Sequence, residues 1–348
     1  MFDRVHHAGI AVGDLQGATD IFADALGLRV DGIRSPRPEG RAQRGADPTD
    51  IIDIPIGHSE LELNAAAAEG TGVHRFVESR GGLGALHHVC LHTTNMADDV
   101  GHLRASGLQQ VAAPPDVLAE NEPWTDVAFF HPRDCMGILL EIWTTEVHRV
   151  DMRYQGEGLF TRMAHIGVVA SDIEKSRHFW TNVIGFRVDM FKSNVLKGGR
   201  HVDSDNVTVL DLPMGDSGIT CVHPNDSESG TARFLEKYGA RAGGTMHHIA
   251  LATADVKTAA DVVQSRGLQL IGPATDDSAW IHPKSAAGVL IEIVKDDLGK
   301  PRPLSRSERA RAIRQGKVVG RTNRELASEY GVSEAEVEAI LSAQGTQD

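Results

Sequence analysis

Two long stretches of this chain are copies of one another, and this repetition constrains the fold more than any other feature of the sequence. Over most of their length the copies are offset by 158 positions, so that His7 aligns with His165. Because each copy is long enough to form a hydrophobic core, we expect two homologous domains. We place them at residues 1–147 and 160–300, with a polar linker at 148–159 and a tail at 301–348. The matching segments are residues 6–31 with 164–189, 51–57 with 209–215, 75–78 with 233–236, and 131–143 with 282–294.

Each domain also repeats weakly within itself. An apolar strand opens with a histidine, a helix follows that ends at a glycine, and further strands lead to an acidic residue inside an apolar run. The glycines suit the left-handed position that ends many helices. The apolar residues between Ala18 and Leu26 recur with helical spacing, and residues 10–12 and 207–209 have the β-branched composition of strands. The sequence therefore predicts an α+β fold of four β-α-β-β-β modules, two in each domain.

The chain has 17 histidines, and three pairs of them are adjacent in sequence. The second member of each pair opens an apolar strand, as His165 does, so we expect the second members to point into a cavity that they share with glutamates from the last strands. The first members, His6, His87 and His247, are then expected beside this site or on the surface. The predicted ligand sets are His7, Glu62, His88 and Glu141 in the first domain, and His165, His248 and Glu292, with Thr220 at the fourth position, in the second.

This donor chemistry predicts metal binding. Imidazole and carboxylate groups together suit a divalent transition ion such as Zn, Ni, Co, Mn or Fe. A single histidine on an apolar strand is more often a hydrogen-bonded core residue, but carboxylates are rarely buried without a partner. Their recurrence at equivalent positions favours metal centres over core histidines, less strongly in the second domain because of Thr220.

These motifs resemble the vicinal oxygen chelate superfamily, which contains glyoxalase I, methylmalonyl-CoA epimerase and the extradiol dioxygenases. The resemblance covers residues 4–297, and the epimerase branch is most similar at residues 165–169, 244–250 and 282–292. It implies that paired modules form a half-open barrel around one metal ion in each domain, held by the ligands named above. Thr220 departs from the epimerase pattern, in which an amide or a carboxylate is expected, and so does the fusion of two module pairs in one chain.

The resemblance implies electrophilic catalysis, in which the ion stabilises an enolate while a carboxylate moves a proton on the neighbouring carbon. We assign this proton transfer to Glu141 in the first domain and to Glu292 in the second. Asp53 and Asp211 are candidate further acid–base groups, although their place ahead of a proline equally suits a strand-end aspartate.

An acyl-CoA substrate would need cationic partners for its phosphates. The sequence contains no recognisable glycine-rich phosphate loop. The candidate partners, for which ordinary surface charge is the competing interpretation, are Arg41, Arg44, Lys192 and Lys197.

Three other functions fit parts of the pattern. The two histidines and one glutamate of the second domain are the ligand type of non-haem Fe(II) oxygenases. Against an extradiol dioxygenase, the first domain has the fuller ligand set, and residues 281–284 replace the tyrosine and acid–proline signature of those enzymes. A glyoxalase-type lyase shares the His–Glu–His–Glu set. A non-catalytic binding or regulatory protein is the least favoured, because a sequestering pocket needs no metal ligands.

Composition narrows the partners. The balance of 35 basic and 48 acidic residues gives a net charge of −13, which argues against a general nucleic-acid-binding surface. The three cysteines show no CxxC spacing, and no apolar run approaches the roughly 18 residues of a membrane span. The sequence also shows no signal-peptide pattern. We therefore expect a cytoplasmic protein that does not enter membranes. The expected partner is a small-molecule substrate, and the sequence leaves homo-oligomer formation open.

The tail differs in composition from the rest of the chain. It is locally basic at residues 301–325, and residues 322–337 have the spacing of a helix-turn-helix. The second of these helices carries Glu334, Glu336 and Glu338, which would repel DNA phosphates. We therefore predict a helical appendage that does not bind DNA.

Overall fold

The computed structural model describes residues 2–43, 47–111, 127–144, 158–189, 192–193, 199–297, 306–318 and 320–343. Arg44, Lys197 and most of the predicted linker lie outside these residues.

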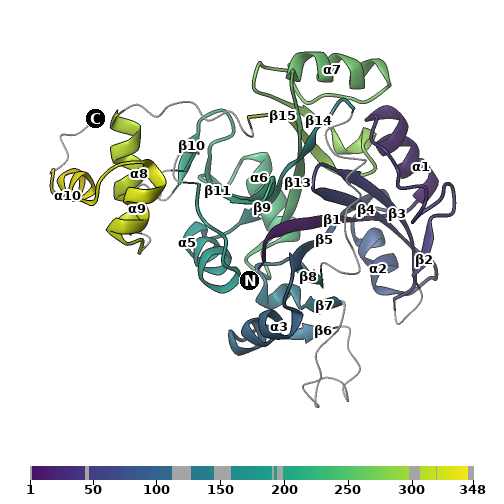
Figure 1. Cartoon of the computed structure of the whole chain (residues 1–348). Coiled ribbons are helices and arrows are strands. Elements are labelled where there is room, and N and C mark those ends of the chain that lie inside the picture. The colour runs from purple at the N-terminus through teal and green to yellow at the C-terminus, as the bar shows by residue number, and fades with distance from the viewer. Residues whose placement is uncertain are drawn as a thin grey trace.

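The elements follow the predicted modules (Figure 1). The first module contains β1 (Arg4–Val12), α1 (Leu15–Thr19), η1 (Asp20–Ala25), β2 (Arg41–Gln43), β3 (Thr49–Ile56) and β4 (Ser59–Ala66). The second contains β5 (Gly84–Thr93), α3 (Met96–Ala105), β6 (Gln110–Val111), β7 (Val127–Phe130), η2 (Pro132–Asp134) and β8 (Leu139–Thr144). The third contains β9 (Arg162–Ala170), α5 (Ile173–His178), η4 (Phe179–Ile184), β10 (Arg200–Val202), β11 (Val207–Met214) and β12 (Ser217–Pro224). The fourth contains β13 (Gly244–Thr253), α7 (Val256–Ser265), β14 (Ser278–Ile281), η6 (Pro283–Ser285) and β15 (Leu290–Lys295).

Each pair of modules forms one curled sheet. The strand order is β2-β3-β4-β1-β5-β8-β7-β6 in the first sheet and β10-β11-β12-β9-β13-β15-β14 in the second. The α+β class and the two half-barrel sheets predicted from the sequence are thereby confirmed. Two helices that the module pattern did not include, α2 (Gly72–Ser79) and α6 (Gly230–Tyr238), connect the modules within each half.

The helix predicted around residues 18–26 exists but changes geometry along its length. It begins as an α-helix at α1 and continues in the wider π-helical form at η1, and α5 and η4 repeat this change in the second half. Phe22 and Trp180, one on each widened segment, are fully buried. The apolar spacing therefore identified the buried face of this helix correctly, but it did not predict the change from α-helix to π-helix.

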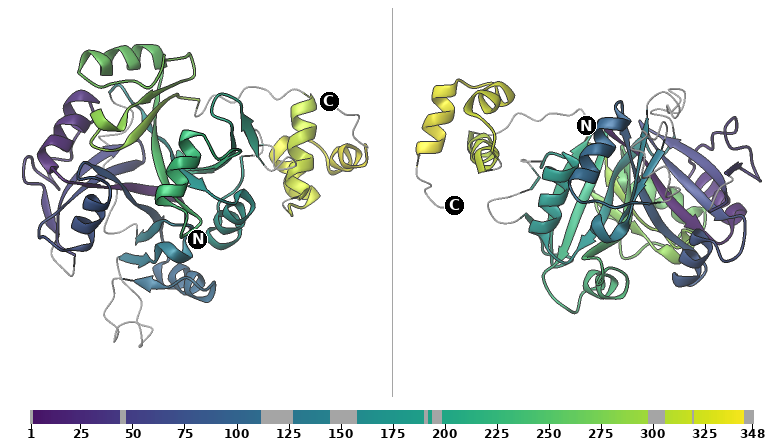
Figure 2. Two further views of the ribbon diagram at one scale, coloured as in Figure 1. Left: turned by 180° about the vertical axis from the view of Figure 1, so that it is seen from behind. Right: turned by 90° about the horizontal axis from the view of Figure 1, so that it is seen from below.

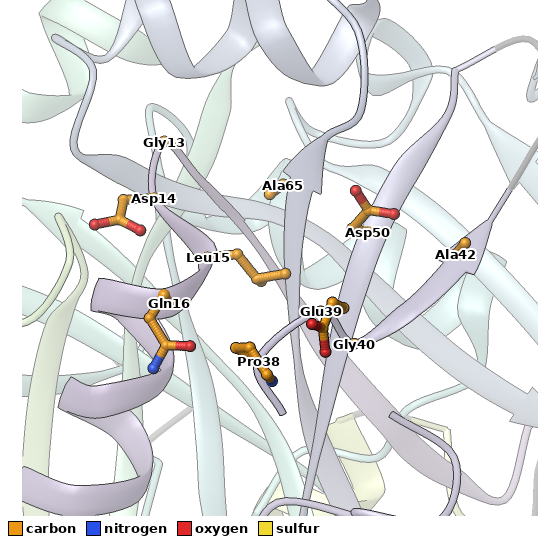
Figure 3. A pocket seen from close by; sticks show the side chains of 10 residues that line it. All are labelled: Gly13, Asp14, Leu15, Gln16, Pro38, Glu39, Gly40, Ala42, Asp50 and Ala65. Carbon is orange, nitrogen blue, oxygen red and sulfur yellow. The ribbon is translucent and has the colours of Figure 1, made fainter. Parts of the chain in front are cut away.

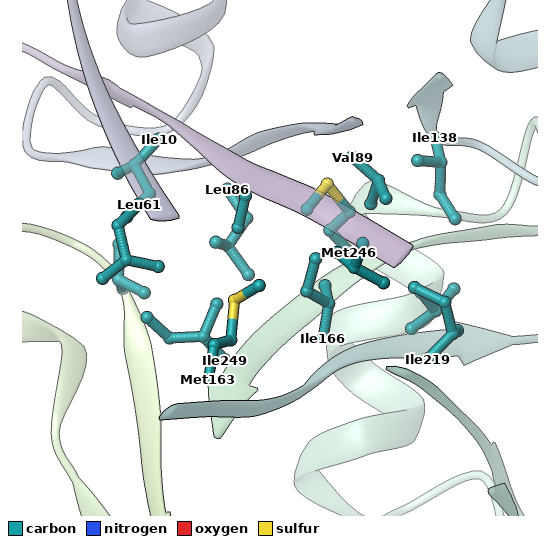
Figure 4. Close-up of a cluster of buried hydrophobic side chains, with 14 of the residues drawn as sticks. Ile10, Leu61, Leu86, Val89, Ile138, Met163, Ile166, Ile219, Met246 and Ile249 are labelled. Atoms are coloured by element: carbon teal, nitrogen blue, oxygen red, sulfur yellow. The ribbon is translucent and has the colours of Figure 1, made fainter. Parts of the chain in front are cut away.

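The two sheets share one hydrophobic core. Apolar side chains from one face of each sheet pack in a single cluster with the helices α3 and α7 and the segments η1 and η4. Figure 4 shows side chains of the first half, among them Leu61 and Leu86, beside Met163 and Ile249 of the second. The opposite faces carry the predicted ligands, and α2 contacts this face of the first sheet through Val73 and Val77.

Polar contacts also join the halves. The backbone N–H of His58, in the turn between β3 and β4, donates to Asp216 Oδ2 at 2.9 Å. Within the second half, Arg162 Nη1 at the start of β9 donates to the carbonyl of this same Asp216 at 2.7 Å. The guanidinium of Arg266 reaches the carbonyls of Asp24 and Ala25 at the end of η1, at 3.4 and 3.3 Å.

The tail forms three helices, α8 (Arg306–Val318), α9 (Asn323–Tyr330) and α10 (Glu334–Ser342), which lie to one side of the sheets (Figure 2). The predicted order of helix, glycine turn, serine cap and helix is confirmed, because α9 ends at left-handed Gly331 and Ser333 caps α10. Ile313, Leu326 and Val337 form a small core, and Val188 of the second half packs on it. Within the described residues, no helix combines the length and apolar character that crossing a bilayer requires.

Candidate metal centres

Four β-bulges place the predicted histidines. In β1, Val5 pairs with Leu91 and His7 with Cys90, so His6 is one extra residue on that strand. The corresponding extra residues are His87 in β5, Ala164 in β9 and His247 in β13. A bulge sets two consecutive residues opposite one, which interrupts the usual alternation of side chains.

The shared core confirms this geometry. Each pair is flanked by two apolar residues, three positions apart, that both face the core, whereas regular alternation would send them to opposite faces. Both members of each pair are therefore directed to the ligand-bearing face. This signal was present in the sequence, and our strand analysis, which gave the first members no defined place, missed it. The flanking residues are Val5 and Ala8, Leu86 and Val89, Met163 and Ile166, and Met246 and Ile249.

In the first half, His7, His88 and Glu141 converge. His7 Nε2 lies 2.9 Å from His88 Nε2 and 2.9 Å from Glu141 Oε2, and His88 Nε2 lies 3.1 Å from the same oxygen. All three residues are buried, and one possible ligand atom from each lies within 4.8 Å of the other two. The other oxygen, Glu141 Oε1, accepts a hydrogen bond from Trp143 Nε1 at 2.5 Å. Two imidazole nitrogens and a carboxylate oxygen aimed at one point fit a divalent transition ion.

The charges of this group also suit a cation. Burial lowers the pKa of His7, but the carboxylates of Glu62, Glu141 and Glu60 outweigh burial and raise it to about 9. Burial opposes ionisation of Glu141, yet His7 and His88 hold the pKa of that carboxyl well below its usual range. The group thus keeps a proton on an imidazole amid negative charge, and a divalent ion can take the place of that proton.

Glu62 does not join the convergent group. Its Oε1 lies 3.8 Å from His88 Nε2, but its Oε2 accepts a hydrogen bond from Arg41 Nη2 at 2.6 Å. The same guanidinium binds Asp53 through Nε at 2.8 Å and Nη2 at 3.1 Å. Arg41 is therefore engaged by two carboxylates rather than facing a phosphate, and Asp53 is ion-paired. Three of the four ligands predicted for the first half come together, and Glu62 lies at their edge.

In the second half, His165, His248 and Glu292 form a looser group. The two Nε2 atoms are 3.2 Å apart, and Glu292 Oε2 lies 3.4 Å from His165 and 3.7 Å from His248. The side chains of His165 and Glu292 are 20% and 16% exposed, against 0% and 5% for His7 and Glu141. Burial, His247 and His165 lower the pKa of His248 well below its usual value. This group is the more accessible of the two.

The remaining predicted residues of the second half lie around this group. Thr220 is buried on β12, directly across from Asp211 on β11, whose carboxylate is 3.3 Å from Arg200 Nη2. This pair repeats the Arg41–Asp53 contact of the first half.

Lys192 Nζ lies 2.9 Å from Asp297 Oδ2. Val294 takes the place of Trp143, so the indole that bonds Glu141 has no counterpart on β15, although Trp280 on β14 lies directly across from Glu292.

Each first member of a histidine pair contacts the ring of the second. The Nδ1–Nδ1 distances are 2.9 Å for His6 and His7, 3.1 Å for His87 and His88, and 3.0 Å for His247 and His248. Burial, with His88 and Arg80, lowers the pKa of His87 to about 3, and burial lowers that of His247 to about 4. Both rings are therefore neutral at physiological pH, and a hydrogen bond at Nδ1 leaves Nε2 of the partner available to an ion.

A separate hollow lies on the other face of the first sheet (Figure 3). Its volume is about 670 Å³, and Asp14, Glu39 and Asp50 contribute carboxylates to its lining. Ala65 also lines it, three positions after Glu62 on β4 and hence on the opposite face of that strand. The hollow therefore does not coincide with the His7–His88–Glu141 group.

Comparison with known proteins identifies the family. Residues 6–129 and residues 162–293 each match a family model described as the Glyoxalase/Bleomycin resistance protein/Dioxygenase superfamily. The chain belongs to this superfamily, as its repeated motifs predicted.

Several relatives are named as enzymes. Mitochondrial methylmalonyl-CoA epimerase of Mus musculus is 27% identical over 139 residues, which is 40% of this chain and 71% of that protein. The ethylmalonyl-CoA/methylmalonyl-CoA epimerase of Cereibacter sphaeroides is 27% identical over 143 residues, covering 41% of this chain and 98% of that one. A mutant of 4-hydroxymandelate synthase from Streptomyces coelicolor superposes with a TM-score of 0.62, covering 85% of this chain and 93% of that one. Its sequence identity of 14% supports a common fold alone.

Proposed function

We propose that this chain is a metal-dependent epimerase that moves a proton on the carbon next to the thioester carbonyl of an acyl-CoA, of the 2-substituted malonyl type. The observation that carries the proposal is the recurrence of two imidazoles and one carboxylate at equivalent positions in both halves. The epimerase relatives supply the substrate class. We also propose the cytoplasm as its compartment, in keeping with three free cysteines.

The residues divide into two roles. His7 and His88, or His165 and His248, would hold an ion of Co, Ni, Zn, Mn or Fe, and the glutamate would complete each set. The ion, when bound, supplies Lewis-acid stabilisation of negative charge on a substrate oxygen. The glutamate would then remove the proton from the neighbouring carbon, and delivery of a proton to the opposite face of the enolate would invert the configuration.

We assign the main catalytic role to the second half. Glu141 has one oxygen against both histidines and the other against Trp143, so its carboxylate is held on both sides. Glu292 has only Val294 in the place of that indole, and it is more exposed. A proton carrier needs an oxygen that can reach the substrate, and Glu292 meets this requirement better than Glu141. In this proposal the first half binds an ion and contributes the slower site.

Deuterium exchange from solvent tests the activity. The cobalt-loaded chain is incubated with methylmalonyl-CoA in deuterated water, and we expect deuterium at the carbon between the two carbonyl groups. Glu292→Gln should slow the exchange by roughly 100-fold or more, the usual contribution of a general base. The matched control is Glu228→Gln, which changes an exposed glutamate of the same half. No exchange in the loaded chain, or equal rates in the two variants, would contradict the proposal.

An Fe(II) oxygenase is the second candidate, because two histidines and one carboxylate with open positions are the donor set of such enzymes. The accessible His165–His248–Glu292 group carries this alternative. Oxygen consumption with catechols by the iron-loaded chain, without any proton exchange on the thioester, would establish it in place of the epimerase.

A further inference from the structure

A second cluster of donor atoms lies behind His7 in the first half. His6, His7 and Cys90 are fully buried, and one possible ligand atom from each lies within 4.8 Å of the other two. His6 Nδ1 lies 2.9 Å from His7 Nδ1, and Cys90 is the cross-strand neighbour of His7. Glu60, also fully buried, brings Oε1 to 3.8 Å from His6 Nδ1.

The second half provides an internal comparison. His165 is retained there, but Ala164 precedes it and Ala250 pairs with it across the strands, in place of His6 and Cys90. Gly218 stands at the position of Glu60 in the sequence repeat. All three additional donors are thus absent from a half that keeps the His–His–Glu group. The cluster is therefore not required to form that group or the sheet that carries it.

His7 can serve both clusters because its two ring nitrogens point in different directions. Its Nε2 lies against His88 and Glu141, whereas its Nδ1 faces His6. An imidazole that has lost both ring protons can bind one ion through each nitrogen, so the two clusters do not compete for an atom.

We propose that the first half contains an inner metal site, formed by His6, His7 and Cys90, that takes a thiophilic divalent ion such as Zn²⁺. One thiolate and two imidazoles are a usual zinc donor set, and Glu60 is placed to supply a fourth donor. Binding releases the thiol proton of Cys90 and the remaining ring proton of His7 to solvent. His7 then bridges the inner ion and the ion of the His7–His88–Glu141 group.

The surrounding charges favour a cation at this position. Burial and the carboxylates of Glu141, Glu62 and Glu60 raise the pKa of the Cys90 thiol far above its usual value, while Arg4 opposes them. The same negative field that holds the proton on the thiol attracts a divalent ion, and a bound metal reverses the preference by stabilising the thiolate. Arg34, which pairs with Glu60, limits how far that carboxylate can move.

Cobalt absorption distinguishes the inner site from the outer ones, because only the inner site contains sulfur. We expect full-length protein titrated with Co²⁺ to develop a near-ultraviolet sulfur-to-cobalt charge-transfer band. Cys90→Ala and His6→Ala copy the residues of the second half, and each should abolish the band and remove one bound ion per chain. The matched control is Cys221→Ala, which changes a buried cysteine of the second half. This variant should keep the charge-transfer band and the full number of bound ions.

The outcome is independent of the epimerase proposal. In a Glu141→Gln variant the outer group is weakened, but the band should persist, since no inner donor has changed. Circular dichroism and the retained ions of the second half verify that each variant is folded. A band that is absent from the unmodified chain, or that survives in folded Cys90→Ala, would overturn the inner site and leave His6, His7 and Cys90 as buried core residues.

Discussion

The ring of His248 occupies the space where a side chain at residue 167 would stand. A Cβ on Gly167 would lie 2.0 Å from His248 Cε1, and a Cβ on Gly9 would lie equally close to His88 Cε1. We therefore expect Gly167→Ala to displace His248 and to lose the ion of the second half while the first half keeps its own. Metal analysis of the purified variant checks this, with Gly230→Ala, where the new methyl group meets nothing, as control. A full metal complement in Gly167→Ala would refute the steric argument.

Protonation of His7 makes metal binding in the first half depend on pH. Its pKa of about 9 lies above the ordinary 6.5, so over this range the ion must displace a proton. We expect the affinity of the first group to rise about tenfold per pH unit from 6.5 and to level off above 9. The same raised pKa stabilises the metal-free fold fully below pH 6.5, and this contribution is lost as the pH passes 9. Competition titrations with a chelator measure the slope, and an affinity that is flat over this range would contradict the assignment.

Residue identities by themselves reveal part of the candidate site. His7, His88 and Glu141 could be selected because their counterparts recur in the second half. Glu62 was selected because it recurs at the Glu141 position within the first domain, although Thr220 replaces it in the second, and the structure pairs it with Arg41. Arg41 comes from a short edge strand, β2, and its register against β3 across the intervening loop follows from no pattern that we read in the sequence.

At the level of elements, the bulges account for the paired histidines. The bulge in β13 sets His247 beside His248 with their Nδ1 atoms 3.0 Å apart. We expect His247→Ala to weaken cobalt binding in the second half by roughly 10- to 100-fold, the usual effect of removing the group that orients a ligand histidine. The fold should persist, because β9 carries alanine at the corresponding bulge position, Ala164.

The control for this experiment is His223→Ala. His223 is bonded to the carbonyl of Ala170 at 3.0 Å and takes no part in the ligand group. Calorimetric titration of both variants gives the two affinities. If His223→Ala and His247→Ala weaken binding equally, the loss reflects general destabilisation and the orienting role of His247 is wrong.

Element types were predictable from periodicity, but their geometry was not fully so. The apolar stripe between Ala18 and Leu26 identified the helix, while the π-helical continuation at η1 left no local signal that we used. The bulges were encoded more openly, by apolar residues three apart on either side of each pair. That spacing indicates a bulge only in a sheet that buries one face, because only there must both flanking apolar residues point to the same side.

At the scale of the whole molecule, the two halves should unfold together. Ile249 is fully buried in the core that both sheets share, close to side chains of the first half (Figure 4). Ile249→Ala removes methyl groups from this core, and we expect a loss of about 2–5 kcal/mol in the free energy of unfolding. Because the cavity opens between the sheets, amide hydrogen exchange should accelerate in β5 and β13 alike, and calorimetry should show one transition at a lower temperature.

The comparison for that substitution is Ile271→Ala, which truncates an isoleucine that is 46% exposed in the same half. A surface truncation of this kind changes stability by about 0.5 kcal/mol or less. Two separate calorimetric transitions in Ile249→Ala, with only β13 exchanging faster, would mean that each half is stable by itself. The repeat would then be two independent domains in one chain, and the shared core would be a contact between them rather than a condition for folding.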